Sequence, residues 1–266
     1  MVESARPFQI LQISDLHIRP NTADTLLGID TDYYFAAVLE HAFTHEKAID
    51  LILLTGDLAQ DPSPASYQRI FHRLTDYAIP SVCLPGNHDD YKLMQAILGS
   101  QFISCRKQLL INNWQLICLN SQLPDSPCGQ LPEDEIQFLL HCLKSHPTHH
   151  AIIALHHHSI PTQSKWMDEM IISNHQQFWE LIGQYPNIKA VTCGHIHQTL
   201  QEIHNGVQVW GTPSTCFQFT PLSPEFSLDD KAPGYRVIQL NVDGSCNTRI
   251  NRLPHKLVGL DPTGRY

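Results

Sequence analysis

The chain has 266 residues, of which 42% are hydrophobic and 16% are charged, and its formal net charge is -9. This length and composition predict one globular domain over residues 1–266 and exclude a disordered or fibrous chain. The negative charge argues against nucleic acid as a partner, because such binding depends on Lys and Arg that neutralise phosphates. A small anionic substrate remains compatible with the charge, since bound metal ions dominate the local field of a site.

The sequence carries no signal for a membrane. Its first ten residues, MVESARPFQI, lack a basic segment followed by an apolar one, and no apolar stretch reaches the length of a membrane span. Eight cysteines are scattered without a CxxC pair, which predicts reduced thiols, several of them in the core. We therefore expect a cytoplasmic protein with no membrane partner, as a monomer or a homodimer.

Short apolar runs alternate with helix-length amphipathic stretches, which is the pattern of an α/β fold. In chain order the pattern predicts a strand at 8–14, a helix at 32–49, a strand at 51–54, a helix at 63–79 and a strand at 81–85. A hairpin at 108–120, turning at Asn112 and Asn113, a helix from Pro132, a strand at 151–155, a helix through 176–182 and a strand at 188–193 follow. Asn205-Gly206 and Asp243-Gly244 predict two further hairpins near the C-terminus.

Polar side chains suited to metal binding come directly after these strands. They are Asp15, His17, Asp57, Asn87, His156, His195 and His197. The ends of strands form the rim on which α/β sites are built. Asp15 and His17 are two residues apart, as are His195 and His197, so in extended backbone each pair would face one way and could hold one ion. Carboxylate, imidazole and amide ligands without thiolate favour Mn, Fe, Zn or Mg over a closed structural zinc site.

Each of these motifs is weak by itself, because a DxH or an HxH sequence arises by chance. The ordered set is much stronger evidence for a metal site, since the motifs recur after successive strands. Gly56, Gly86 and Gly194 stand beside the motifs. They predict sharp turns that bring the backbone close to the ions, and the alternative is that they only interrupt strands.

Five segments resemble the signature blocks of calcineurin-like metallophosphoesterases: ISDLH, LLTGDLAQD, LPGNHDD, ALHHH and TCGHIHQ, between residues 13 and 198. LLGIDT, GDLAQD, CGHIHQ and TPSTCFQF further resemble the bacterial class III cyclic AMP phosphodiesterase branch. The resemblance covers nearly the whole chain. It implies a four-layer sandwich of two mixed β-sheets flanked by helices, in which about residues 199–266 form mostly short strands that complete the second sheet.

The same resemblance implies a centre of two divalent ions, Fe and/or Mn, with Zn or Mg as alternatives. Asp15, His17, Asp57 and His197 would hold the first ion, and Asp57, Asn87, His156 and His195 the second. Asp57 would bridge the ions and so belong to the catalytic machinery. Asn87, His88 and His197 would contact the substrate phosphate. His88 would either protonate the leaving oxygen or attract the phosphate only, with Asp57 or Asp89 as its partner.

The implied reaction is hydrolysis of 3',5'-cyclic AMP to 5'-AMP by a hydroxide that bridges the ions, with cyclic GMP as an alternative substrate. Two other functions stay open: action on another small phosphoester, and an inactive binding module on the same fold. The presence of all seven ligands argues against the inactive module. The chain has no nucleophile elbow, P-loop or HExxH motif, which fits hydrolysis without a protein nucleophile.

Several other residues are candidate contacts. Trp166, Phe217 and Phe219 could stack on a purine, although aromatic residues in apolar runs more often lie in the core. His157 and His158 follow a candidate ligand, and strand alternation predicts that His157 points away from His156. We therefore expect neither to touch metal or substrate.

Overall fold

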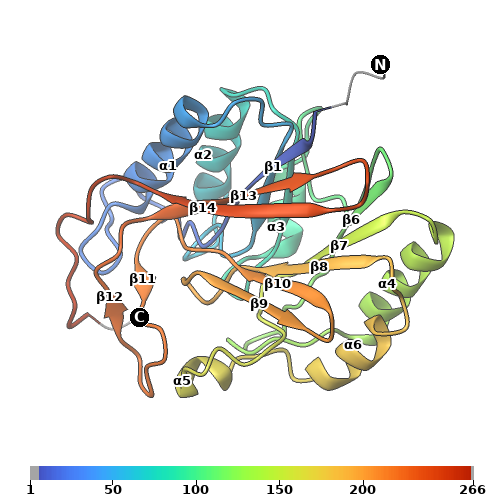
Figure 1. The fold of residues 1–266 in the computed structure, drawn as a ribbon. Coiled ribbons are helices and arrows are strands. Elements are labelled where there is room, and N and C mark those ends of the chain that lie inside the picture. The colour runs from blue at the N-terminus through green and yellow to red at the C-terminus, as the bar shows by residue number, and fades with distance from the viewer. Residues whose placement is uncertain (1–5, 265–266) are drawn as a thin grey trace.

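The structure is a computed structural model that describes residues 6–264. Within this range two six-stranded mixed sheets pack face to face, with helices on their outer sides (Figure 1). The strands of the first sheet are, in order, β14 (Cys246–Arg252), β13 (Gly234–Leu240), β1 (Phe8–Ile13), β2 (Leu51–Thr55), β3 (Ser81–Leu84) and β4 (Ile103–Ser104). The expected sandwich of two mixed sheets flanked by helices is confirmed.

The strands of the second sheet are, in order, β5 (Gln108–Ile111), β6 (Trp114–Cys118), β7 (His150–Ala154), β8 (Ile188–Cys193), β10 (Val207–Gly211) and β9 (Leu200–His204). A separate two-stranded sheet pairs β11 (Gln218–Phe219) with β12 (Leu228–Asp229). The helices are α1 (Thr31–His45), α2 (Pro64–Thr75), α3 (Tyr91–Ile97), α4 (Glu133–Ser145), α5 (Lys165–Asp168) and α6 (His175–Ile182). Figure 1 shows α1, α2 and α3 beside the first sheet, and α4 and α6 beside the second.

The central strands are buried on both faces, which explains their unbroken apolar runs. In β2, Leu51 and Leu53 belong to the core between the sheets, whereas Ile52 and Leu54 pack in the core beneath the helices of the first sheet. β1 alternates in the same way. Because such a strand packs against a layer on each face, its position is fixed. The polar residues that follow its carboxyl end are therefore held in defined positions.

The C-terminal part divides between the two sheets, which corrects the expectation that residues 199–266 complete the second one. Only β9 and β10 join the second sheet, whereas β13 pairs antiparallel with β1 in the first. Val237 packs beneath the helices of that sheet, and Ile238 faces the other sheet. β13 therefore covers an edge of β1 that would otherwise expose unpaired backbone groups.

The remaining local expectations hold with shifted boundaries. Both C-terminal hairpins form, and so does the hairpin of β5 and β6. The first helix ends at His45 and not at Ile49, and Ala48 has a φ of 63° that a helix does not allow. The short helix α3 was not predicted, although Asp90 caps it by accepting a hydrogen bond from the N–H of Leu93.

Two further observations concern the whole described chain. All eight cysteines are free thiols, and six of them are buried, as the scattered spacing predicts. No helix within residues 6–264 is both long and apolar enough to cross a membrane.

Candidate metal centre

The seven side chains predicted as ligands converge where strands of the two sheets end. One group contains Asp15, His17 and His197: the Nε2 atoms of the two histidines are 3.2 Å apart, and Oδ1 of Asp15 lies 3.5 Å from Nε2 of His197. The ligand atoms of these three residues lie within 4.8 Å of one another. The first DxH pair thus meets the second histidine of the HxH motif.

The second group surrounds Nε2 of His156. Oδ1 of Asn87 is 3.1 Å from this nitrogen, Nδ1 of His195 is 3.2 Å from it, and Oδ2 of Asp57 is 3.3 Å from it. The same Oδ2 of Asp57 lies 3.9 Å from Nε2 of His17. Asp57 therefore stands between the two groups, as a bridging ligand would.

The local backbone differs from the extended form that the sequence suggested. Five of the seven residues have a positive φ: Asp15 at 56°, His17 at 49°, Asp57 at 51°, His195 at 66° and His197 at 45°. The convergence of Asp15 and His17 thus does not come from strand alternation. The expectation that His195 and His197 grip one ion is wrong, because their side chains fall into different groups. Such strained backbone in non-glycine residues is found mainly at functional sites.

Three imidazoles are held by hydrogen bonds at Nδ1, which leave Nε2 facing the cluster. Nδ1 of His197 donates to the carbonyl of Phe217 at 2.9 Å, and Nδ1 of His156 donates to the carbonyl of Thr55 at 2.8 Å. Nδ1 of His17 lies 2.7 Å from Oε1 of Gln60. Hydrogen bonds of this kind fix the tautomer and the ring orientation of metal-binding histidines.

These tautomers test whether the residues fit metal ions. With hydrogen on Nδ1, the Nε2 atoms of His17 and His197 present lone pairs to each other at 3.2 Å. Nε2 of His156 likewise faces the oxygens of Asn87 and Asp57. Lone pairs at such distances repel unless a cation or a proton lies among them. The donor set therefore fits divalent cations, and its lack of thiolate fits a hydrolytic site better than a structural one.

Electrostatics in this cluster are dominated by burial. Burial lowers the pKa of His17 and His195 well below the usual value and that of His197 to about 3, so these rings are neutral. Burial raises the pKa of Asp15 to about 7.

At Asp57 and His156, neighbouring charges outweigh the effect of burial on the pKa. Burial would raise the pKa of Asp57, but His156 and His88 hold it well below its usual range. Burial would lower the pKa of His156, but Asp57 raises it to about 9. Binding of cations here would therefore displace protons from Asp15 and His156.

Glycine allows the close approach of backbone at the three predicted turns, as Gly56 and Gly86 illustrate. A Cβ atom on Gly56, whose φ is 93°, would lie 2.4 Å from Nδ1 of His156. A Cβ atom on Gly86 would lie 2.2 Å from Oδ1 of Asp57. A side chain at either position would collide with the cluster. These glycines are therefore needed for space and do more than interrupt strands.

His88 borders the cluster, and a nitrogen of its ring lies within 4.8 Å of ligand atoms of His17 and Asp57. Its backbone N–H donates to Oδ1 of Asp57 at 2.9 Å, and its Nδ1 lies 3.3 Å from the carbonyl of Gln60. The carboxylate of Asp89 instead accepts hydrogen bonds from Tyr67 and from the backbone of Leu58, Ala59 and Gly86. Asp89 therefore shapes the loop that presents Asn87 and His88.

His157 and His158 both lie beside the cluster, against the ring of His195. Both are fully buried, and the ring of His157 lies 4.7 Å from that of His195. Nδ1 of His157 contacts Oγ of Ser121 at 2.8 Å, and a nitrogen of this ring lies within 4.8 Å of ligand atoms of His156 and His195. The only signal in the sequence was the run of three histidines.

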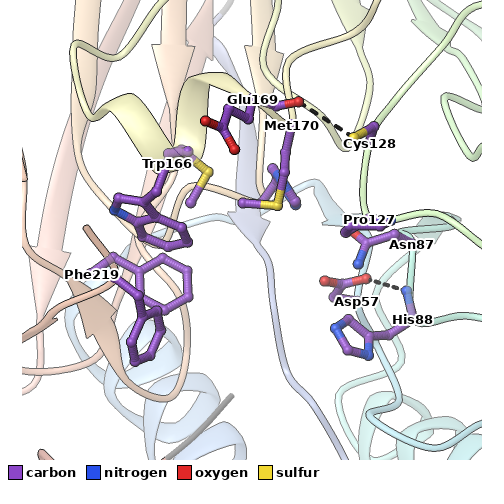
Figure 2. Close-up of a pocket in the computed structure, with 12 residues that line it drawn as sticks. Asp57, Asn87, His88, Pro127, Cys128, Trp166, Glu169, Met170 and Phe219 are labelled. Carbon is purple, nitrogen blue, oxygen red and sulfur yellow. Dashed lines mark hydrogen bonds between the residues drawn. The ribbon is translucent and has the colours of Figure 1, made fainter. Parts of the chain in front are cut away.

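A cavity of about 580 Å³ opens beside the cluster, and Asp57, Asn87, His88 and His195 line one part of it (Figure 2). Trp166 and Phe219 also line it, whereas Phe217 does not. Phe217 is fully buried, and its ring stacks at 5.8 Å on that of His17. Two of the three aromatic residues weighed as purine contacts therefore reach the cavity, and the third packs behind the cluster.

Comparisons with known proteins agree with this arrangement. The family model described as calcineurin-like phosphoesterase matches residues 8–199. The 3',5'-cyclic adenosine monophosphate phosphodiesterase CpdA of Escherichia coli is 39% identical over 92% of this chain and 90% of its own length. A 3',5'-cyclic-nucleotide phosphodiesterase of Nostoc is 37% identical over 97% of this chain and 96% of its own length. A solved dimetal phosphatase of Danio rerio superposes with a TM-score of 0.61 over 92% of this chain and 99% of its own, at 13% identity, which shows a shared fold.

Proposed function

This chain belongs to the calcineurin-like phosphoesterase family, and we propose that it hydrolyses 3',5'-cyclic AMP to 5'-AMP. The family consists of phosphoester hydrolases with a binuclear metal centre, and the chain has clusters of His and Asp that could bind metal. The names of relatives at 37% to 39% identity over most of the chain support the choice of substrate. The observation that carries the metal site is the approach of Nε2 of His17 to Nε2 of His197 at 3.2 Å, with both rings in contact with an oxygen at Nδ1.

The proposed ligand sets follow the two groups in the structure. Asp15, His17, Asp57 and His197 would hold one ion, and Asp57, Asn87, His156 and His195 would hold the other. We propose Fe and/or Mn as the resident ions, because imidazole with carboxylate and amide oxygen suits them, and Zn or Mg would also accept these donors. When bound, two such ions supply Lewis-acid polarisation of the phosphate and a water made acidic enough to attack at neutral pH.

The side chains around the ions would orient the phosphate and move the proton. Asn87 and His88 come from the loop after β3 and line the cavity together. We propose that both contact the phosphate, and that His197 is a third contact. The imidazole of His88 would donate a proton to the departing ribose 3'-oxygen, which is otherwise a poor leaving group. Its Nδ1 lies 3.3 Å from the carbonyl of Gln60, a contact that orients the ring.

A panel of substrates tests the proposal. Purified protein loaded with Mn is offered cyclic AMP, cyclic GMP, an aryl phosphomonoester, an aryl phosphodiester and duplex DNA. We expect turnover of cyclic AMP to 5'-AMP, little cleavage of duplex DNA because of the net charge of -9, and no activity after chelation. Efficient cleavage of duplex DNA together with inert cyclic AMP would refute the proposed substrate.

A further inference from the structure

The cavity beside the cluster has two chemically different ends. Asp57, Asn87, His88 and His195 line it, and so do Trp166, Met167, Met170, Phe219 and Phe226. In Figure 2 the polar side chains of Asp57, Asn87 and His88 lie opposite the rings of Trp166 and Phe219. Its volume of about 580 Å³ lies within the usual range for small-molecule sites, roughly 300–1,000 Å³. A cyclic nucleotide has the same division, with an anionic phosphate at one end and a flat, weakly polar base at the other.

Three aromatic rings build the far end, and we call them the aromatic wall: Trp166 from α5, Phe219 from β11 and Phe226 from the turn before β12. The ring of Trp166 meets that of Phe219 at 5.0 Å and 82°, and that of Phe226 at 5.4 Å and 76°. The ring of Phe219 stacks on the imidazole of His197 at 4.3 Å and 21°. The wall therefore begins at a proposed metal ligand and extends away from it.

Hydrogen bonds hold the segment that carries Trp166. Oδ1 of Asp168 accepts from the N–H and the hydroxyl of Thr162 at 2.6 and 2.7 Å, and Oδ2 accepts from the N–H of Gln163 at 3.0 Å. Across the cavity, the thiol of Cys128 donates to the carbonyl of Glu169 at 3.4 Å. Figure 2 shows Trp166 and Phe219 on one side of the cavity, with Asp57, Asn87 and His88 on the other.

We propose that the aromatic wall is the subsite for the substrate's nucleobase, which lies against Trp166 and Phe226 while the phosphate lies at Asn87 and His88. This inference rests on the proposed function and names the part of the protein that recognises the base. Stacking on aromatic rings tolerates any base, because every base has a π-face. The wall therefore raises affinity for cyclic AMP and cyclic GMP alike and does not choose between them.

The test compares cyclic AMP with a base-free analogue, methyl ribofuranoside 3',5'-cyclic phosphate. The variants are Trp166→Ala and Phe226→Ala, whose side chains are only partly buried, with Trp166→Phe as the conservative variant. Tyr33→Ala is the control, since Tyr33 is 63% exposed and lines a separate groove beside α1. The measured quantity is kcat/KM for cyclic AMP divided by kcat/KM for the analogue.

We expect this ratio to fall about tenfold in Trp166→Ala and in Phe226→Ala, the size of a lost base–aromatic contact. It should recover in Trp166→Phe and keep the wild-type value in Tyr33→Ala. Cyclic GMP should lose as much as cyclic AMP. A ratio that stays at the wild-type value in both alanine variants overturns the inference while leaving the proposed hydrolysis intact.

Binding of adenosine, which has no phosphate, separates the two proposals. Saturation-transfer NMR on the metal-loaded protein should show adenosine bound to the wild type, with the signal lost in Trp166→Ala and unchanged in Tyr33→Ala. Adenosine binding that persists in Trp166→Ala, or is absent from the wild type, overturns the subsite. A wild type that binds adenosine through Trp166 but does not hydrolyse cyclic AMP supports the subsite and refutes the proposed substrate.

Discussion

The backbone N–H of His88 donates to Oδ1 of Asp57 at 2.9 Å, while Oδ2 of the same carboxylate lies 3.3 Å from Nε2 of His156. The proposed acid and the proposed bridging ligand are thus joined through the main chain of residue 88. Replacing the imidazole leaves this hydrogen bond in place. The role of the His88 side chain can therefore be separated from the integrity of the metal centre.

His88→Ala should lower kcat/KM for cyclic AMP by roughly a hundredfold, as expected for loss of a general acid. The loss should be much smaller for an aryl phosphodiester, because a phenolate leaves without a proton. Steady-state kinetics on both substrates measures this, with metal content held at two equivalents. Equal losses on the two substrates would instead assign the imidazole to electrostatic binding of the phosphate.

Asn87→Ala should lower metal content from two equivalents toward one and reduce activity, because Oδ1 of Asn87 lies 3.1 Å from Nε2 of His156 in the proposed second site. The melting temperature measured in chelator should change little, since Asn87 is only partly buried. Metal analysis decides the outcome, with Asn247→Ala on the exposed face of β14 as the control. Full metal content and full activity in Asn87→Ala would remove this residue from the site.

Alanine substitutions at two glycines can distinguish backbone strain from steric crowding by the new Cβ atom. Gly56 and Gly206 have φ values of 93° and 82°, but only at Gly56 would a Cβ meet a neighbour, at 2.4 Å from Nδ1 of His156. Gly206→Ala should cost about 1–2 kcal/mol of stability and retain both metals. Gly56→Ala should cost more and lower metal content, as chemical denaturation and metal analysis would reveal. Indistinguishable losses in the two variants would contradict the crowding.

Asp168→Ala should destabilise the protein by about 1–2 kcal/mol at neutral pH through lost hydrogen bonds to residues 162 and 163. It should also raise KM for cyclic AMP, because those bonds hold the segment that carries Trp166. Urea denaturation and steady-state kinetics measure the two effects, and Asp168→Asn should retain part of both. If the variant is clearly destabilised but its KM is unchanged, the segment that carries Trp166 does not contribute to substrate binding.

The stability difference between wild type and Asp168→Ala should depend on pH. Burial would raise the pKa of Asp168, but the nearby imidazole of His158, with Nε2 3.7 Å from Oδ1, and the hydrogen bonds from Thr162 outweigh it and hold the pKa below 3.8. The carboxylate therefore contributes fully above pH 3.8 and loses its contribution as pH falls through the lower folded value. Denaturation of both proteins between pH 6 and pH 3 should show the difference shrinking only at the acidic end. A difference that grows on acidification would have the wrong sign for this account.

The sequence by itself determined the longer strands and helices and the seven polar residues that follow strand ends, but not short elements such as α3. These features are local. A strand buried on both faces, such as β2, can be recognised from five consecutive apolar residues, and a turn such as Asn205-Gly206 can be recognised from two residues. Because the strands bearing the site run parallel within each sheet, polar residues after them share one edge without any knowledge of distant contacts.

Tertiary structure alone decided how those residues are grouped. His197 meets Asp15 and His17, whereas His195 meets His156, because positive φ angles turn the two neighbouring side chains toward different partners. Packing likewise placed Phe219 in the cavity and Phe217 behind it, and it brought β13 beside β1 in the first sheet. Such contacts join residues far apart in the chain. These contacts depend on how the two sheets pack against each other. A local pattern of residues does not predict that packing.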